Sequence, residues 1–288
     1  MIKQSYLFSF AVMLVIMLAN LSVPSHAASL GDGNQIPHIG DAGRADYLKF
    51  TSAPLPRAFA IAPGGVWAWV SGGDTKELTE LDALNSCRQY TEQTCQLYAV
   101  DDQVVFDETQ WTSSWRLHLD GNAVANAPVG IGRAQRFPDL ALTSPNNRPI
   151  MLSDLRGKPV FLHFWGSWCP PCQTEFADLQ KLYNAIKNDD AISFVLVQGR
   201  ESIEKSQRWM EKRKFVMPLY DSGHKGRGDK SFRLANGTLL ADRRLALAYP
   251  TTYILDANGL VVFHQSGAGE QWAQYENLIR HLTDSGIQ

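Results

Sequence analysis

Apolar residues are densest in the middle of the chain. A continuous apolar and aromatic run from Val160 to Trp165 stops at Gly166-Ser167, as expected for a buried strand that ends in a turn. Apolar residues then recur at helical spacing, which predicts a helix from Gln173 to about Lys187. A further apolar run at residues 191–198 predicts a second buried strand.

The pattern around this centre alternates between strands and helices. The expected elements are, in chain order, a hairpin over 139–152, the central strand and helix, the strand at 191–198, an amphipathic helix at 201–214, a short strand at 218–221, a hairpin over 253–264, and a closing helix marked by Trp272, Tyr275, Ile279 and Leu282. This order is typical of a layered α/β domain, which we place at residues 136–288.

A smaller α+β module is predicted at residues 57–106. Residues 57–62 and 66–71 alternate in polarity around the turn Pro63-Gly64-Gly65, which indicates a hairpin. Asp74 or Thr75 can cap a following helix that runs to about Tyr90. We expect its buried stripe to consist of Leu78, Leu81 and Leu84. Strands are expected at 94–100 and 103–106. The tryptophans nearby, which could form a binding face or belong to the core, are Trp67, Trp69, Trp111 and Trp115.

The other segments predict targeting and connection. Residues 1–27 combine Lys3, an apolar run and a small-residue end at Ala27, which is typical of a cleaved signal peptide and predicts a periplasmic protein. An uncleaved membrane anchor is the alternative. Residues 28–56 are expected to be a flexible lead-in, and residues 107–135 an interdomain linker rich in Gly, Ala and Asn.

Composition narrows the function classes. The chain has 288 residues, 44% of them apolar, and a formal net charge of −2, so neither nucleic acid binding nor an acidic tail is indicated. No G-x-G-x-x-G follows a strand, and we therefore expect no flavin or nicotinamide cofactor.

Four cysteines allow three disulfide pairings. In an exported protein all four can be oxidised, and the spacing favours Cys169 with Cys172 and Cys87 with Cys95. The second pair would close a short loop and stabilise the small module by about 2–3 kcal/mol. The alternative for Cys87 and Cys95 is two free buried thiols.

The sequence around Cys169-Pro170-Pro171-Cys172 is typical of a redox-active pair of cysteines. The prolines suit the first turn of a helix, which puts Cys169 near the N-cap, where the helix dipole favours a thiolate. Cys172 lies three residues on, within reach for a disulfide. A structural disulfide and half of a zinc site are the alternatives; zinc is disfavoured because the chain has no second C-x-x-C and no matching histidine pair. We expect no metal.

These residues and their surroundings resemble the TlpA/ResA-like branch of the thioredoxin superfamily. The similar segments are Trp168 to Cys172 (WCPPC), residues 152–159 (LSDLRGKP) and residues 249–256 (YPTTYILD) with the Gly259 turn, so the resemblance covers residues 136–282. It implies a thioredoxin-like fold, a central mixed sheet flanked by helices, and a cis peptide bond before Pro250.

The resemblance also implies roles for single residues. Cys169 would attack and Cys172 would resolve the mixed disulfide. The backbone beside Pro250 would pair with an extended substrate segment, so Trp168, Tyr249 and Thr251 are candidate substrate contacts. Glu175 would tune the cysteines or, alternatively, be a solvated acid of the first turn. His163 occupies the strand position where thioredoxins keep a buried acid; we expect a hydrogen-bonded core histidine, and we expect Trp165 to shield the pair with Trp168.

We therefore predict an exported thiol–disulfide oxidoreductase that reduces protein disulfides. The two prolines leave the Cys169 thiolate with few donors, which favours a reductant. The resemblance implies a membrane electron donor of the DsbD kind and clients such as apocytochrome c. The alternatives are a redox-switched binding protein whose N-terminal module recognises the partner, and a peroxidase, for which the T-x-x-C site is missing. Residues 222–248 are longer than the family's usual connection and rich in Lys and Arg, as expected of a target-selecting loop or a solvated insertion.

Overall fold

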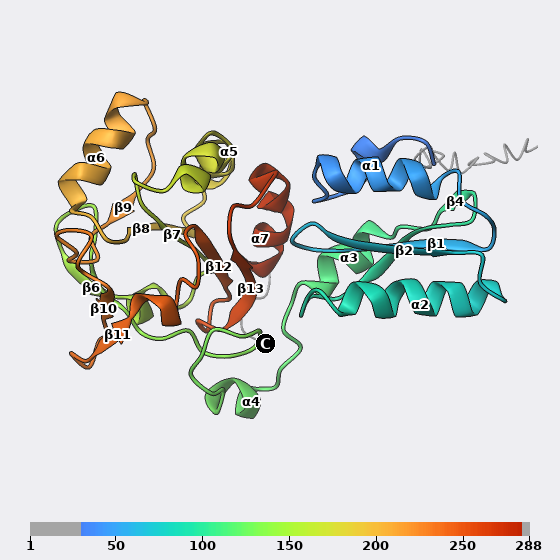
Figure 1. Ribbon diagram of the computed structural model, residues 1–288. Helices are drawn as coiled ribbons and strands as arrows, with labels where there is room; N and C mark the ends of the chain where they lie inside the picture. Colours follow the sequence, from blue (N-terminus) through green and yellow to red (C-terminus); the bar gives the residue numbers. More distant parts are fainter. Residues whose placement is uncertain (1–29, 284–288) are drawn as a thin grey trace, which may run out of the picture.

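The computed structural model describes residues 30–283, in which two larger β-sheets are covered by helices (Figure 1) and two further sheets have two strands each. The smaller unit has a four-stranded sheet in the order β2-β1-β3-β4, and the larger has a five-stranded sheet in the order β13-β12-β7-β8-β9. The segment expected to be a signal peptide, residues 1–27, lies outside the described residues. Within residues 30–283 no helix is both long and apolar enough to cross a membrane.

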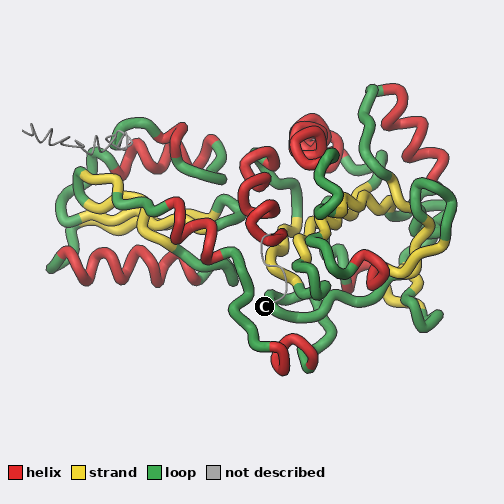
Figure 2. Tube along the Cα trace, turned by 180° about the vertical axis from the view of Figure 1, so that it is seen from behind, coloured by secondary structure: helices red, strands yellow, loops and turns green. Residues whose placement is uncertain are grey.

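The smaller unit is a three-layer sandwich. Its strands are β1 (Arg57–Ala62), β2 (Val66–Ser71), β3 (Gln96–Val100) and β4 (Gln103–Val104). Helix α1 (Asp41–Phe50) and helix α2 (Lys76–Arg88) cover opposite faces of the sheet, as both views show (Figures 1 and 2). All six residues of β1 are buried because helices lie on both sides of it.

The face that α2 buries differs from the predicted leucine stripe. Thr79, Ala83 and Cys87 are buried, whereas Leu78 and Leu81 are about half exposed. Leu84, the third leucine of the predicted stripe, is half-buried and does pack against the sheet. The centre of the strand face under the helix is formed by the alanines of β1, Ala58, Ala60 and Ala62, against which small side chains of the helix can pack closely. Cys87 is joined to Cys95 by a disulfide within this small-residue layer.

The expected flexible lead-in and linker are largely structured. Residues 28–56 contain α1, whose Tyr47 and Phe50 are fully buried against Phe59. The linker contains α3 (Glu108–Ser114) and α4 (Gly121–Ala125). The sequence pattern did not predict these helices because their apolar residues are too few to show a period. Helices α1 and α3 nevertheless contribute buried aromatic residues to the core, whereas α4 has no buried residue.

The two units share one apolar core. Trp115, fully buried, stacks on Phe263 of the larger unit with ring centroids 5.3 Å apart. His38 stacks on Tyr275 at 4.0 Å. The Arg133 guanidinium donates to the carbonyl of Val262 (2.6 Å). Trp111 and Trp115 therefore belong to the core, and Trp67 and Trp69 are half-buried with their indole N–H groups donating to Asp46.

The larger unit has a thioredoxin-like fold. Its central strand is β7 (Val160–Trp165). On one side, β7 pairs in parallel with β8 (Ser193–Gln198), and β8 pairs in parallel with β9 (Leu219–Tyr220). On the other side, β7 pairs antiparallel with β12 (Thr251–Leu255), and β12 pairs antiparallel with β13 (Val261–Ser266). The helices are α5 (Pro170–Ile186), α6 (Ile203–Lys212) and α7 (Glu276–Thr283). The short elements are β5 (Ala141–Thr143), β6 (Pro149–Met151), β10 (Ser231–Arg233), β11 (Leu239–Ala241), and the 3-10 turns at Gly33–Gln35, Leu152–Leu155, Asp242–Arg244 and Trp272–Tyr275.

The strand register positions the site. Thr251, the first residue of β12, lies opposite Phe164 near the end of β7. The loop before β12 and the turn after β7 therefore emerge at the same edge of the sheet, next to the first turn of α5.

Candidate active site

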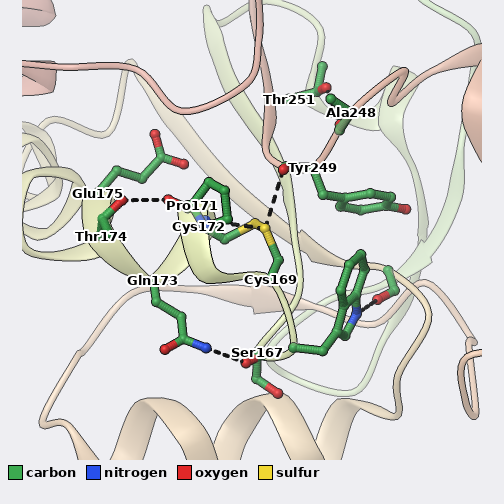
Figure 3. The surroundings of a disulfide bond; sticks show 12 residues. Ser167, Cys169, Pro171, Cys172, Gln173, Thr174, Glu175, Ala248, Tyr249 and Thr251 are labelled. Carbon is green, nitrogen blue, oxygen red and sulfur yellow. Dashed lines mark hydrogen bonds between the residues drawn. A yellow bond between two sulfur atoms is a disulfide. The ribbon is translucent and has the colours of Figure 1, made fainter.

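Cys169 and Cys172 form a disulfide at the start of α5 (Figure 3). Cys169 is the N-cap residue, and Pro170 and Pro171 occupy the first two helical positions. The Cys172 amide donates to Cys169 Sγ (3.2 Å), while the prolines between the cysteines carry no N–H. The helix start thus supplies Cys169 Sγ with one donor from inside the motif.

The loop before β12 lies against the sulfurs. The Tyr249–Pro250 peptide bond is cis, and the Tyr249 carbonyl oxygen points at Cys169 Sγ at 3.3 Å (Figure 3). A disulfide sulfur has no proton, so this is a contact in the oxidised protein and becomes a hydrogen bond only when Cys169 is a thiol. Thr251 is fully buried, and its hydroxyl donates to the Ala248 carbonyl (2.7 Å), which holds the loop in shape.

Two aromatic rings flank the pair. Trp168 and Tyr249 meet edge to face with centroids 5.2 Å apart, and the Trp168 indole N–H donates to the Gly199 carbonyl (2.9 Å). Cys169 is only 2% exposed and Cys172 is fully buried, so the sulfurs are nearly covered in the oxidised protein. Trp165 was expected to shield the pair. Instead it is fully buried in the core at the end of β7, where its ring packs against that of Phe176 with centroids 4.3 Å apart.

Glu175 is buried one helical turn beyond Cys172, on the same stretch of α5 (Figure 3). Its Oε2 accepts hydrogen bonds from the Gly269 amide and the Trp272 indole, both at 2.9 Å. Burial raises the pKa of this carboxyl to about 8, although both hydrogen bonds act in the opposite direction. The alternative of a solvated first-turn acid is therefore wrong.

His163 faces Glu175 from β7. Its Nε2 lies 3.5 Å from Glu175 Oε1, and its Nδ1 forms a hydrogen bond with Thr252 Oγ1 (2.8 Å). Burial lowers the pKa of His163 to about 3. At neutral pH the imidazole is neutral and the carboxyl is mostly protonated, so the contact joins two neutral groups and is not an ion pair. The expected hydrogen bond of a core histidine is present, but the ring also faces the acid.

Glu201 holds the turn that leads into Cys169, which the sequence pattern did not indicate. It is 2% exposed, and it accepts from the Ser167 amide (2.5 Å), the Ser167 hydroxyl (2.6 Å) and the Ser206 hydroxyl (2.6 Å). A glutamate at the predicted start of an amphipathic helix gives no sign of such burial, because its partners are brought together only by the fold.

Arg200 and Asp242 form a second unpredicted pair beside Tyr249. The guanidinium donates to both carboxylate oxygens of Asp242 (2.5 and 3.0 Å) and lies over the Tyr249 ring, 5.5 Å from its centroid. Asp242 belongs to residues 222–248, so the long connection contributes directly to the wall around Tyr249. Among residues 30–283 no group of three or more His, Cys, Asp or Glu side chains could hold a metal ion.

Comparisons with known proteins agree with this geometry. Residues 134–264 match the family model described as AhpC/TSA family. The chain is 30% identical to the thiol-disulfide oxidoreductase ResA of Bacillus subtilis over 172 residues, which cover 57% of this chain and 86% of that protein. The chain belongs to the ResA-like thiol–disulfide oxidoreductases.

A second relative and two solved structures are also similar to part of this chain. ResA of Geobacillus kaustophilus is 32% identical over 50% of this chain and 73% of its own. A putative thiol:disulfide interchange protein DsbE from Chlorobium tepidum is 20% identical, with a TM-score of 0.41 over 53% of this chain and 99% of its own. StoA from Bacillus subtilis is 20% identical, with a TM-score of 0.38 over 50% of this chain and 98% of its own.

Membership in this ResA-like family confirms the resemblance inferred from WCPPC and YPTTYILD. It identifies the protein as an enzyme that exchanges thiols and disulfides, with disulfide-containing proteins as its class of substrate. The fold class, a thioredoxin-like domain preceded by a disulfide-bonded α+β unit, is also confirmed.

Proposed function

We propose that this protein is an exported reductase of protein disulfides that works through Cys169 and Cys172. In the reduced enzyme the Cys169 thiolate attacks one sulfur of a client disulfide, forming a mixed disulfide and releasing the other client sulfur as a thiolate. The Cys172 thiolate then attacks Cys169 Sγ, which releases the second client sulfur and leaves the Cys169–Cys172 disulfide. Two electrons pass from the enzyme to the client.

The proposal that the protein acts as a reductant rests on the small number of hydrogen-bond donors to Cys169 Sγ. The Cys172 amide at 3.2 Å is the one donor from the motif, and no histidine lies between the cysteines to add positive charge. A weakly stabilised thiolate means a weakly stabilised reduced form, which gives up its electrons readily. The electrons would be replaced by a membrane donor of the DsbD kind, and the clients would be exported proteins such as apocytochrome c or others with oxidised cysteines.

Glu175 would exchange a proton with Cys172 during resolution. Its pKa of about 8 in the oxidised protein is close to that of an ordinary thiol, about 8.5, so proton transfer between the two groups costs little free energy. His163, neutral and 3.5 Å away, faces the oxygen that accepts no hydrogen bond from the Gly269 and Trp272 groups.

Clients would bind along the loop before β12. The Tyr249 carbonyl faces Cys169, and an extended client segment can add to the backbone there. Because Cys169 is only 2% exposed, we propose that the half-buried Trp168 ring moves aside when a client binds. The smaller unit, residues 30–106 with α3, would then be held rigidly beside this face by the shared core.

The deciding experiment is reduction and trapping. The reduced protein should reduce insulin, followed by turbidity, and Cys169→Ser should abolish turnover. Cys172→Ala should accumulate client proteins as mixed disulfides through Cys169, identified by mass spectrometry. Retained turnover in Cys169→Ser would refute the proposal. If the unaltered protein showed no turnover and Cys169→Ser still bound its partner, the result would favour the alternative of a redox-switched binding protein.

A further inference from the structure

Residues 222–248, which we call the basic loop, carry a charge unlike that of the rest of the chain. The loop holds two acidic side chains, Asp229 and Asp242, and six basic ones: Lys225, Arg227, Lys230, Arg233, Arg243 and Arg244. Its formal charge is +4, whereas the whole chain carries −2. In Figure 1 the loop, drawn in orange with β10 and β11, lies at the outer side of the larger unit, below α6.

The two acidic groups of the basic loop have partners within the protein: one is buried in an ion pair, and the other lies at the surface and binds backbone amides. Asp242 is 1% exposed and paired with Arg200. Asp229 accepts from the backbone amides of Lys225 and Gly226. All six basic side chains are exposed, and within residues 30–283 none of them forms an ion pair. A solvated surface normally mixes both signs of charge, whereas here six exposed cations stand against one surface carboxylate, Asp229.

Hydrogen bonds hold the basic loop next to the active site. His224 Nδ1 accepts from the Arg200 amide (2.9 Å), and Asp242 binds the Arg200 guanidinium. The Tyr249 hydroxyl donates to Asp242 (3.4 Å), and the carbonyl of the same tyrosine lies 3.3 Å from Cys169 Sγ. One residue, Tyr249, therefore connects the loop with the reactive sulfur.

Lys230 and Arg244 flank this junction. The Lys230 carbonyl accepts from the Asp242 amide (2.8 Å), and Arg244 ends the turn that Asp242 begins. Leu247, 57% exposed, lies between them and Tyr249 in the chain and adds an apolar contact point. Exposed charges of one sign beside a binding face raise the rate of encounter with partners of the opposite sign.

We propose that the basic loop binds acidic side chains that flank the disulfide-bonded cysteine of the client, and so selects clients with an acidic segment at that cysteine. This inference rests on the proposed function, because it names the class of client for the same site. The bound segment would run along the loop before β12, with its cysteine at Cys169 and its carboxylates toward Lys230 and Arg244.

The test uses the reduced full-length protein and three fluorescence-quenched peptides that contain the same disulfide, flanked by aspartates, serines or lysines. The second-order rate constant of reduction is measured for each peptide and divided by that of dithiothreitol with the same peptide. We expect the aspartate peptide to react about tenfold faster than the lysine peptide at about 0.1 M salt, and the ratio to approach one at about 1 M, where the Debye length is about 3 Å.

The variant Lys230→Glu/Arg244→Glu takes the charge of the basic loop from +4 to zero, since each substitution changes it by −2. Within residues 30–283 neither side chain forms a hydrogen bond or an ion pair that the exchange would break, and both are exposed. The matched control is Lys158→Glu/Lys187→Glu, with the same change in total charge. Both control residues are exposed and lie at the ends of β7 and α5 remote from Cys169.

We expect the first variant to lower the aspartate-to-lysine ratio to about one and the control to retain it. The inference would be overturned if the unaltered protein reduced the aspartate and lysine peptides at equal rates, or if Lys230→Glu/Arg244→Glu kept the ratio of the unaltered protein. In either case, reduction of the serine peptide would leave the proposed function intact. If the unaltered protein reduces none of the three peptides, the proposed function fails, and this inference fails with it.

Discussion

His163 Nε2 lies 3.5 Å from Glu175 Oε1 in the interior of the larger unit, and both side chains are nearly or fully buried. The distance is longer than an ordinary hydrogen bond, and neither atom has a hydrogen-bond partner among residues 30–283. Burial moves the two pKa values in opposite directions, to about 8 for the acid and about 3 for the imidazole. Each group therefore has its own effect on the pH dependence of stability.

Glu175→Gln should remove a loss of stability that the unaltered protein shows above pH 4.5. The folded pKa of about 8 exceeds the ordinary value of 4.5, so the unfolded chain releases this proton first and stability falls as pH rises from 4.5 to 8. The slope contributed by this one group approaches about 1.4 kcal/mol per pH unit. Glutamine keeps an oxygen for the Gly269 and Trp272 donors.

Urea unfolding of both oxidised proteins across this range measures the effect. The free energy of unfolding of the variant, relative to the unaltered protein, should increase from pH 4.5 to 8 and then stay constant. Parallel curves would mean that Glu175 ionises normally in the folded protein.

His163→Asn should act in the opposite pH direction. The folded pKa of about 3 is below the ordinary 6.5, so below pH 6.5 the unfolded chain takes up a proton that the folded protein does not, and stability falls as pH decreases from 6.5 toward 3. Asparagine lacks this titration. The same unfolding series should show the unaltered protein losing stability relative to the variant below pH 6.5. A constant difference at all pH values would contradict the neutral, buried histidine.

Glu201→Ala should destabilise the turn before Cys169. The substitution leaves the Ser167 amide and the hydroxyls of Ser167 and Ser206 without their acceptor in a buried place, which we expect to cost about 3 kcal/mol. Because this turn positions Cys169, the rate of exchange with a small disulfide should fall as well. Glu201→Gln is the control, since its side-chain oxygen can still accept, and it should lose less stability than the alanine variant. Equal losses in both variants would show that the carboxylate's hydrogen bonds are not what holds the turn.

Removing the second disulfide should affect stability and not exchange. Cys87→Ala/Cys95→Ala opens a loop with a sequence separation of 8 residues, which costs about 2–3 kcal/mol on the chain-entropy model. The pair lies in the small-residue layer under α2, in the unit that does not contain Cys169. The variant should therefore unfold at a lower urea concentration and still reduce insulin in native buffer. Loss of activity in a folded variant would assign the pair a role in exchange.

Much of the site was predictable because its signals are local. The strand before Gly166-Ser167, the helix that starts at two prolines, and the spacing of Cys169 and Cys172 depend on residues close in sequence. Backbone conformation and the helix dipole act over one or two turns, so such motifs indicate their own structure. The resemblance of residues 249–256 to the family added the loop that meets the cysteines from a distant part of the chain.

The predictions that failed depended on which surface each element meets. The leucines of α2 have helical spacing, yet the fully buried residues of the helix are Thr79, Ala83 and Cys87, which meet the alanines of β1, and of the leucines only Leu84 packs against this layer. Helix α1 has few apolar residues, and it is held because Tyr47 and Phe50 pack on Phe59 of the sheet. Burial of this kind is set by the partner surface, which a single stretch of sequence does not contain.

The sequence by itself determined the reactive group, a pair of cysteines at a helix start after a buried strand, and through the family resemblance it indicated the proline loop beside them. Tertiary structure decided the environment of that chemistry. It removed Glu175 and His163 from water and placed them 3.5 Å apart, buried Glu201 under Ser167, and joined the basic loop to Tyr249 through Arg200 and Asp242. The spacing of residues along the chain determines which groups can react. Their burial and their hydrogen-bond and ion-pair partners depend on residues that only folding brings together.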